Sequence, residues 1–223
     1  METDLDFIPF EGERFLEVDM LKKSQEFYEW ANTRRSVRDF SSKEVPVEIM
    51  NNLIMTASTA PSGAHKQPWT FCLISNKALK SKLRTLAEEE EFISYNSRMS
   101  EEWKNDLTPL GTNWEKEFID IAPWIVVVMK KVYDIGESEE KQTNYYVAES
   151  VGIAVGMMLL AVHNVGLVAL THTPSPMNFI AKVLNRPKNE RPFLLIPIGY
   201  PAENARIPNL KRKGKKQVIE LYE

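Results

Sequence analysis

Apolar residues recur at intervals of three and four positions in several stretches of the chain, which is typical of helices with one buried face. After Pro46, for example, Met50, Leu53 and Ala57 follow this spacing. Near the N-terminus, Ser24 precedes a similar stretch and is expected to cap it. The expected helices cover residues 24–33, 79–95, 145–164 and about 178–184, together with one that follows Pro46 and stops before Pro61.

Short apolar runs between these stretches predict strands. The run 124–129 is continuous and rich in β-branched residues, as in strands buried on both faces. The expected strands cover residues 69–75, 124–129, 167–173 and 193–199. Because helices and strands alternate, the pattern predicts an α+β or α/β sandwich. No repeat or linker divides the chain, so residues 1–223 are expected to form one domain.

The composition is that of an ordinary globular protein, with 43% hydrophobic and 26% charged residues. A formal net charge of −3 argues against nucleic acid as a partner, because binding to phosphate backbones needs a basic face. The single cysteine, Cys72, excludes an intrachain disulfide. Since it lies in an apolar run, Cys72 is expected to be a buried structural thiol.

Residues 1–6 are acidic and lack the basic and apolar regions of a secretory signal peptide. The longest apolar run, 151–162, is shorter than the roughly 20 residues of a membrane-spanning helix. We therefore expect a soluble domain. A membrane anchor in a segment upstream of this chain remains compatible with the sequence.

Several classes of catalytic site find no support in the motifs. His65, His163 and His172 lie in different expected elements without cysteines or carboxylates at ligand spacing, so no metal site is expected. The chain has no Gly-x-Ser-x-Gly elbow, P-loop or Gly-x-Gly-x-x-Gly motif. Hydrolase, NTPase and Rossmann-type functions therefore have no anchor in the sequence.

A cluster of cations follows the first expected helix. Arg34, Arg35 and Arg38 bring three guanidinium groups within five residues, and Ser36 adds a hydroxyl. Such a cluster suits an anionic ligand, because arginine binds phosphate through two parallel hydrogen bonds. By itself it is more typical of a solvated face or of ion pairs.

Three further segments are compatible with a ligand site. The loop 60–69 is rich in small residues, whose backbone N–H groups allow a flat ligand to approach. On the expected strand 167–173, alternation places the hydroxyls of Thr171 and Thr173 on one face and His172 on the other. The basic segment 211–216 would by itself be a solvated tail.

Taken together and in this order, the segments resemble the flavin-binding framework of the nitroreductase superfamily. The resemblance extends from about Glu26 to Lys213. It implies an α/β sandwich of the α+β class, with a central mixed sheet flanked by helices, assembled as an intertwined homodimer. The residues that carry it are Arg34-Arg35-Ser36-Val37-Arg38, Ala60 to His65, Gln67-Pro68-Trp69, Gly199-Tyr200-Pro201 and the basic tail.

The resemblance implies FMN as the cofactor. Arg34, Arg35 and Ser36 would hold its phosphate and ribityl chain, and Arg212 would help at the phosphate. Arg38 would lie by the pyrimidine edge of the flavin, where a cation stabilises the reduced cofactor.

The remaining cofactor residues implied by the resemblance come from two segments. Pro61 and Ser62 would reach the flavin from the partner subunit, and Thr171, His172 and Thr173 would line it. Thr173 would be catalytic, because a hydroxyl beside flavin N5 favours one-electron steps over hydride transfer. His172 departs from the threonine expected in vertebrate relatives, but facing away from Thr173 it should have little effect.

Additional motifs resemble the branch of the superfamily that removes halogen reductively from mono- and diiodotyrosine. Glu91 would bind the substrate ammonium, Lys116 the carboxylate and Tyr95 a polar group, while the Ala64 N–H would donate to the phenolate. Glu91 and Tyr95 share a helix face by their spacing of four. Without the resemblance, the glutamates would be read as a solvated helix face. The motifs are Glu88 to Glu91 with Tyr95, Asn113-Trp114-x-Lys116-Glu117 and Pro208-x-Leu210-Lys211-Arg212-Lys213.

The same resemblance implies a mobile lid over residues 88–117 and a C-terminal extension over 201–223. Two other functions remain open: an FMN nitroreductase or quinone reductase, which needs no zwitterion clamp, and a non-catalytic flavin or halotyrosine binder, which could lose Thr173. Because no nicotinamide motif occurs, a separate NAD(P)H-dependent reductase is expected as the electron donor.

Overall fold

The computed structural model describes residues 7–223, so the expectation drawn from residues 1–6 lies outside the described part. Its internal contacts define two compact units, Met1–Arg34 and Arg35–Glu223. The expectation of one domain over residues 1–223 stays a prediction.

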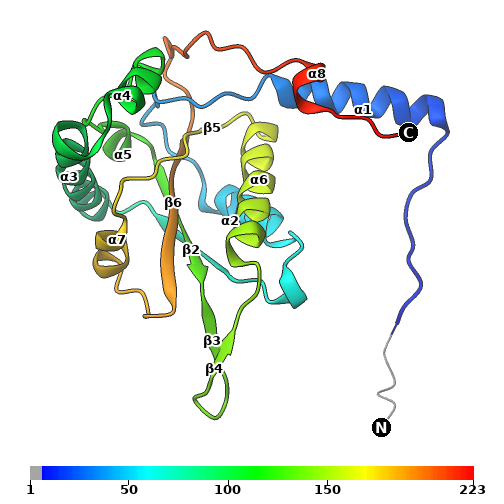
Figure 1. Cartoon of the computed structure of the whole chain (residues 1–223), viewed down its shortest axis with the longest axis horizontal. Coiled ribbons are helices and arrows are strands. Elements are labelled where there is room, and N and C mark those ends of the chain that lie inside the picture. The colour runs from blue at the N-terminus through cyan, green and yellow to red at the C-terminus, as the bar shows by residue number, and fades with distance from the viewer. Residues whose placement is uncertain (1–6) are drawn as a thin grey trace. The chain divides into compact units, whose positions relative to one another are not determined.

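The first unit contains helix α1, Glu17–Asn32 (Figure 1). It begins before the predicted stretch 24–33, and Ser24 is not its cap. Instead, the Ser24 hydroxyl lies inside the helix and donates to the Leu21 carbonyl at 2.8 Å. A serine within a helix can satisfy its hydroxyl in this way, so it gives an ambiguous signal for a helix start.

The second unit is centred on a four-stranded sheet in the order β1-β2-β6-β5. Its strands are β1 (Trp69–Ile74), β2 (Trp124–Lys131), β5 (Val168–Ala169) and β6 (Glu190–Gly199). All neighbouring strands pair antiparallel, which corrects the expectation of a mixed sheet. Among the described residues, the parallel contribution is limited to the bridge between Ser36 and Ala169. Strand direction is set by the connections, which hydrophobic patterning does not report.

Helices cover both faces of this sheet (Figure 1). One face carries α2 (Val47–Ser58) and α6 (Val147–Asn164), and the other carries α3 (Lys77–Ile93), α5 (Phe118–Ile121) and α7 (Asn178–Val183). Alternate β2 residues enter the two cores: Val126 and Val128 join the α2–α6 side, and Ile125 and Val127 the α3 side. The prediction of a strand buried on both faces is confirmed.

The stretch after α3, predicted to be a lid, is largely helical. It contains η2 (Ser94–Arg98), α4 (Glu101–Leu107) and η3 (Thr108–Leu110). Its mobility stays a prediction.

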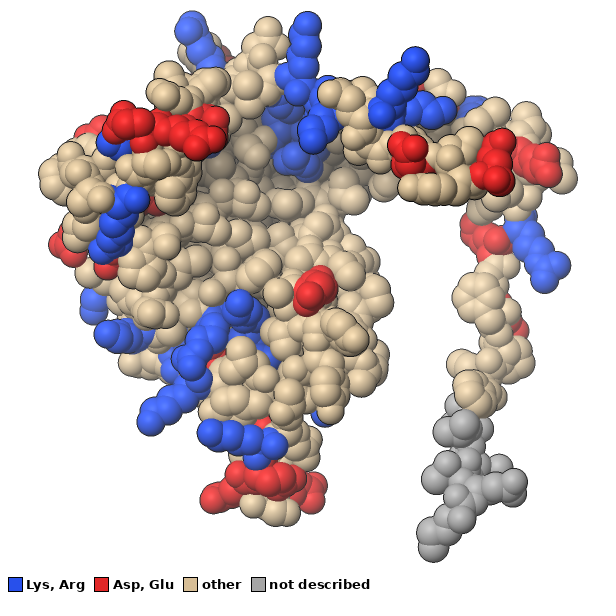
Figure 2. All heavy atoms as spheres, viewed as in Figure 1, with Lys and Arg blue, Asp and Glu red and all other residues tan. Residues whose placement is uncertain are grey.

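A hairpin not foreseen from the sequence, β3 (Tyr133–Ile135) with β4 (Lys141–Thr143), leads into α6. Figure 2 shows acidic side chains gathered at its tip, where Glu137, Glu139 and Glu140 are exposed. Near the C-terminus, the segment 201–223 forms one short helix, α8 (Lys215–Val218). Strands of three residues, such as β3 and β4, are too short for an alternating pattern to identify them.

The structure also differs from two predictions for the strand 167–173 and for Cys72. The strand predicted at 167–173 is regular only over β5, with an isolated bridge from His172 to Leu195. Cys72 is half-buried rather than fully buried, and burial raises the pKa of its thiol.

Helix α6 is long and apolar enough to cross a membrane by length and composition alone. In the structure, its Val155 and Met158 belong to the core shared with α2 and the sheet. This agrees with the prediction of a buried core helix, although one face of α6 is exposed at Gly152, Ile153 and Gly156.

Candidate functional site

The segment that follows Arg35 and the threonine segment meet at the β5 edge of the sheet. Ser36 forms a parallel bridge with Ala169, and the Val37 N–H donates to the Ala169 carbonyl at 3.2 Å. Ala169 lies two residues before Thr171, and Ser36 lies two residues before Arg38. Two segments that the sequence analysis singled out separately are therefore neighbours.

The C-terminal extension lies against the same segment. The Arg206 N–H donates to the Asp39 carboxylate at 2.9 Å, and the Arg35 guanidinium donates to the Pro208 carbonyl. Arg212 follows a few residues later and is exposed. Arg34 is half-buried and is the last residue of the first unit.

Side chains alternate between exposed and buried from 171 to 173, as predicted. Thr171 and Thr173 are exposed, whereas His172 is buried. The His172 backbone exchanges two hydrogen bonds with Leu195, each of 2.9 Å. This pairing holds the two hydroxyls on the opposite side of the chain from the imidazole.

The His172 ring packs edge-on against Phe118, with ring centres 5.6 Å apart. Its Nε2 has no hydrogen-bond partner among the described residues. Burial, assisted by the positive charges of Lys116 and Arg38, lowers the pKa of His172 to about 3. The imidazole is therefore neutral at physiological pH.

Glu91, Tyr95 and Lys116 come together on the α3 side of the sheet. The Lys116 Nζ lies 3.4 Å from Glu91 Oε2 and 5.7 Å from the centre of the Tyr95 ring. The Tyr95 hydroxyl donates to the Thr112 carbonyl at 3.4 Å, and the Lys116 ammonium donates to the Asn113 carbonyl. Backbone acceptors of this kind leave no side-chain signal, so sequence reasoning did not identify their role.

Burial governs the electrostatics of this group. It raises the pKa of Glu91 and lowers the pKa of Lys116, while the attraction between them opposes both shifts. Burial also raises the pKa of Tyr95 and lowers that of nearby Arg38. A ligand with both an ammonium and a carboxylate would give each buried charge a second partner.

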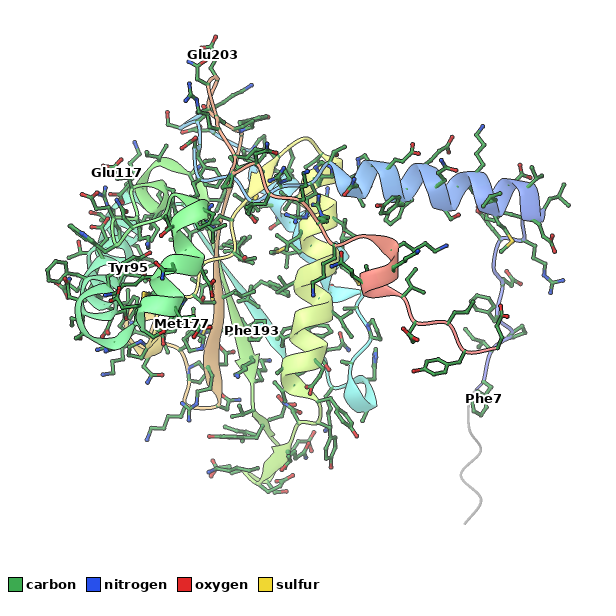
Figure 3. All side chains as sticks on the ribbon, turned by 45° about the horizontal axis from the view of Figure 1, so that its top comes forward. Phe7, Tyr95, Glu117, Met177, Phe193 and Glu203 are labelled. Atoms are coloured by element: carbon green, nitrogen blue, oxygen red, sulfur yellow. The ribbon has the colours of Figure 1, made fainter. Side chains whose placement is uncertain are left out.

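A cleft of about 460 Å³ has Arg38, Thr112 and Asn113 in its wall. This volume lies in the range of small-molecule sites, roughly 300–1,000 Å³. Glu91, Tyr95 and Lys116 do not line the cleft, but the Thr112 and Asn113 carbonyls accept hydrogen bonds from Tyr95 and Lys116. Figure 3 shows Tyr95 and Glu117, the neighbour of Lys116, on the same side of the sheet.

The loop of small residues, 60–69, contacts α6 and the residues just before it. The Gly63 N–H donates to Ser150 Oγ at 3.3 Å, and a Cβ on Gly63 would lie 2.8 Å from the Tyr145 carbonyl oxygen. Ala64 adopts a left-handed φ of 49° within the turn η1 (Gly63–His65).

In the same loop, Ser62 Oγ accepts a hydrogen bond from the Gln67 N–H at 2.9 Å. Pro61 and Ala64 are exposed. Within the second unit, Ser36 lies at the β5 edge together with the segment that contains Thr171 and Thr173, whereas Pro61 and Ser62 lie in the loop beside α6.

The sequence profile of the nitroreductase family matches residues 31–200. This chain belongs to the nitroreductase family. It is 57% identical over 216 residues to iodotyrosine deiodinase from Haliscomenobacter hydrossis, covering 97% of each chain. It is 44% identical over 219 residues to human iodotyrosine deiodinase 1, covering 98% of this chain and 76% of the human protein. Both relatives place it among the family's iodotyrosine deiodinases.

A solved structure shows the same relationship. The crystal structure of oxidized iodotyrosine deiodinase bound to FMN and 3-iodo-L-tyrosine matches with a TM-score of 0.77 and 30% identity. The match covers 88% of this chain and 98% of that chain. The predicted nitroreductase-like sandwich is therefore confirmed, with an antiparallel central sheet.

Proposed function

We propose that this protein is an FMN-dependent reductive dehalogenase of halogenated tyrosines, converting mono- and diiodotyrosine to tyrosine and halide. The observation that carries the proposal is the buried Glu91–Lys116 pair with Tyr95. Two of these residues donate to the Thr112 and Asn113 carbonyls, and Thr112 and Asn113 lie in the wall of the Arg38 cleft. The identity to iodotyrosine deiodinases over nearly the whole chain supports it.

The arginines and the serine of residues 34–38 are donors of the kind that FMN requires. Arg34, Arg35 and Ser36 would bind the phosphate and ribityl chain, with Arg212 contributing to the phosphate. Arg38, half-buried in the cleft wall, would face the pyrimidine edge of the flavin. Guanidinium and hydroxyl donors match phosphate oxygens, and a cation at that edge favours the reduced flavin.

Thr171 and Thr173 expose their hydroxyls beside this donor set, and the buried His172 holds the backbone between them. Thr173 would act as the catalytic residue, with its hydroxyl oxygen accepting a hydrogen bond from the N–H at flavin N5. Pro61 and Ser62 would complete the site from a second copy of the chain.

The substrate is bound by complementary charges. Glu91 accepts the substrate ammonium, Lys116 donates to the carboxylate, and Tyr95 adds a hydrogen bond. The Ala64 N–H donates to the phenolate oxygen, which orients the ring. Closure of residues 88–117 over the substrate excludes water and strengthens each of these contacts. The chemistry contributed by bound, reduced FMN is the supply of two electrons, which with one proton replace the carbon–halogen bond by carbon–hydrogen.

A homodimer accounts for the exposed face of α6. At Gly152 and Gly156 an added Cβ would meet no atom within 4 Å of the described chain. Glycines spaced by four on an apolar helix allow a second helix to pack closely against them. We propose that the partner subunit occupies this face and presents its loop 60–69 to the site.

The electrons are proposed to come from a separate NAD(P)H-dependent reductase, because the chain has no nicotinamide-binding motif. The chain is proposed to act as a soluble catalytic domain, whether or not a membrane anchor precedes it.

The deciding experiment is anaerobic turnover of the FMN-loaded protein with dithionite as reductant. Tyrosine and halide are measured for 3-iodo-, 3-bromo- and 3-chlorotyrosine, with a flavin-only control. We expect equal amounts of tyrosine and halide, at rates far above the control. Reduction of a nitroaromatic without any halide release from halotyrosines would instead indicate a nitroreductase.

A further inference from the structure

Helix α3 carries three charged residues at intervals of four, on the face toward the segment that contains Lys116. The Lys80 ammonium donates to the Asp120 carbonyl at 3.0 Å and to the Ala122 carbonyl at 2.6 Å. Arg84 donates to the Asp120 carboxylate at 3.1 Å and to Glu88 at 2.8 Å. Residues spaced by four share one helix face, so these contacts form a continuous row.

Glu88 is the member of this row next to the proposed substrate clamp. Its Oε1 accepts from the Lys116 backbone N–H at 2.7 Å and from Arg84 Nε at 2.8 Å. The Glu88 side chain is 18% exposed and that of Lys116 is 3% exposed. Hydrogen bonds to a shielded carboxylate are among the stronger ones in proteins.

The charge of Glu88 also acts on the Lys116 side chain. Burial lowers the pKa of Lys116, and the nearby carboxylates of Glu91 and Glu88 oppose that shift. Glu88 thus both anchors the Lys116 backbone and helps keep its ammonium charged.

We propose that Glu88 is a positioning residue for substrate recognition, which holds Lys116 so that its ammonium meets the substrate carboxylate in a fixed geometry. Arg84 in turn fixes the Glu88 carboxylate. This inference rests on the proposed function, because it assumes that Lys116 binds the substrate carboxylate.

The contacts of Lys80 and Arg84 indicate that Glu88 can be replaced without unfolding this region. Lys80 and Arg84 hold the end of α5 through Asp120 and Ala122, and these contacts do not involve Glu88. Removing the Glu88 carboxylate should therefore leave α5 attached to α3. It should release only the Lys116 backbone.

The test compares Glu88→Ala and Glu88→Gln with Glu89→Gln, a matched control at the exposed neighbouring position. Calorimetry on the FMN-loaded protein measures binding of 3-iodotyrosine and of 2-iodophenol, which lacks the amino-acid group. For Glu88→Ala we expect the 3-iodotyrosine Kd to rise about five- to tenfold. For Glu88→Gln, the 3-iodotyrosine Kd should rise less, because the amide oxygen still accepts one hydrogen bond. KM should rise with little change in kcat, while FMN retention and iodophenol binding stay unchanged.

A double-variant cycle with Lys116→Gln separates the possible outcomes. If Glu88 acts through Lys116, adding Glu88→Ala to Lys116→Gln causes no further loss of 3-iodotyrosine binding. If Lys116→Gln binds 3-iodotyrosine as wild type does, the clamp in the proposed function is wrong. If only Lys116→Gln weakens binding and Glu88→Ala behaves like Glu89→Gln, the positioning role alone is overturned. Equal losses of FMN, iodophenol and iodotyrosine binding in Glu88→Ala would also overturn it, since they indicate general structural damage.

Discussion

The Lys116 ammonium lies 3.4 Å from the Glu91 carboxylate, and only 3% and 11% of the two side chains are exposed. The two charges therefore compensate each other inside the protein before any substrate binds. Removing one member of a buried pair leaves the other charge unpaired, at a cost of about 3–5 kcal/mol. Replacement of either residue should then affect both stability and substrate binding.

Glu91→Gln and Lys116→Gln should each weaken 3-iodotyrosine binding roughly 10- to 150-fold, since each removes a charge-assisted contact of about 1.5–3 kcal/mol. Each should also lower the free energy of unfolding. The double variant should recover much of the stability without recovering affinity. Urea unfolding and calorimetry measure the two effects. A double variant that binds 3-iodotyrosine normally, or a wild type that binds 2-iodophenol equally well, would refute the zwitterion clamp.

Arg34→Ala should reduce retention of FMN by tenfold or more, because a charge-assisted phosphate contact is lost. Flavin fluorescence after gel filtration measures the fraction released. Arg14→Ala, at an exposed position in the same unit, is the matched control. Equal FMN retention by both variants would show that Arg34 does not bind the FMN phosphate.

Thr173→Ala should leave stability nearly unchanged, because the side chain is exposed. Losing one hydrogen bond of about 1 kcal/mol to the flavin should slow halotyrosine reduction roughly fivefold. Hydride-type reduction of a nitroaromatic should hold steady or improve. Steady-state assays on both substrates measure the ratio. A parallel fall in the two activities would make Thr173 a packing residue.

His172→Leu should make stability less sensitive to acid. The pKa of His172 is lowered from 6.5 to about 3 in the folded state, so at intermediate pH the unfolded chain binds the extra proton. Stability from neutral His172 is complete above pH 6.5 and is lost as the pH falls toward 3. From pH 7 to pH 5, the free energy of unfolding should fall by about 2 kcal/mol more in the wild type than in the variant.

Urea unfolding at the two pH values measures that difference. Because His172 Nε2 has no partner among the described residues, leucine should cost little stability at pH 7. Identical pH dependence in wild type and variant would show that His172 titrates normally in the folded protein.

Gly156→Leu tests the proposed dimer face on α6. In one chain the new side chain meets open space, and leucine favours a helix by about 0.8 kcal/mol over glycine. The substitution should therefore stabilise an isolated chain. In a dimer, the leucine side chain would displace a partner helix that packs against Gly156. We expect a shift from dimer to monomer in light scattering, with loss of FMN. A more stable dimer that retains FMN would place the interface elsewhere.

The sequence by itself determined those features that depend on local order. The helical stripe after Pro46 and the doubly buried strand at 124–129 follow from spacing, because periodicity reports which faces of an element are buried. The alternation of Thr171, His172 and Thr173 follows from strand geometry in the same way. Family resemblance singled out the charged residues, but it did not show which of them touch.

Only the tertiary structure decided how distant segments meet. The antiparallel order of the sheet depends on the connections between strands, and the contact of Glu88 with the Lys116 N–H depends on how the chain returns through α4 and η3. Because every residue except proline has the same backbone N–H, no sequence pattern predicts such a contact. Burial of the Glu91–Lys116 pair likewise results from packing of α3 against the segment before α5, because the run of glutamates alone suits a solvated helix equally well.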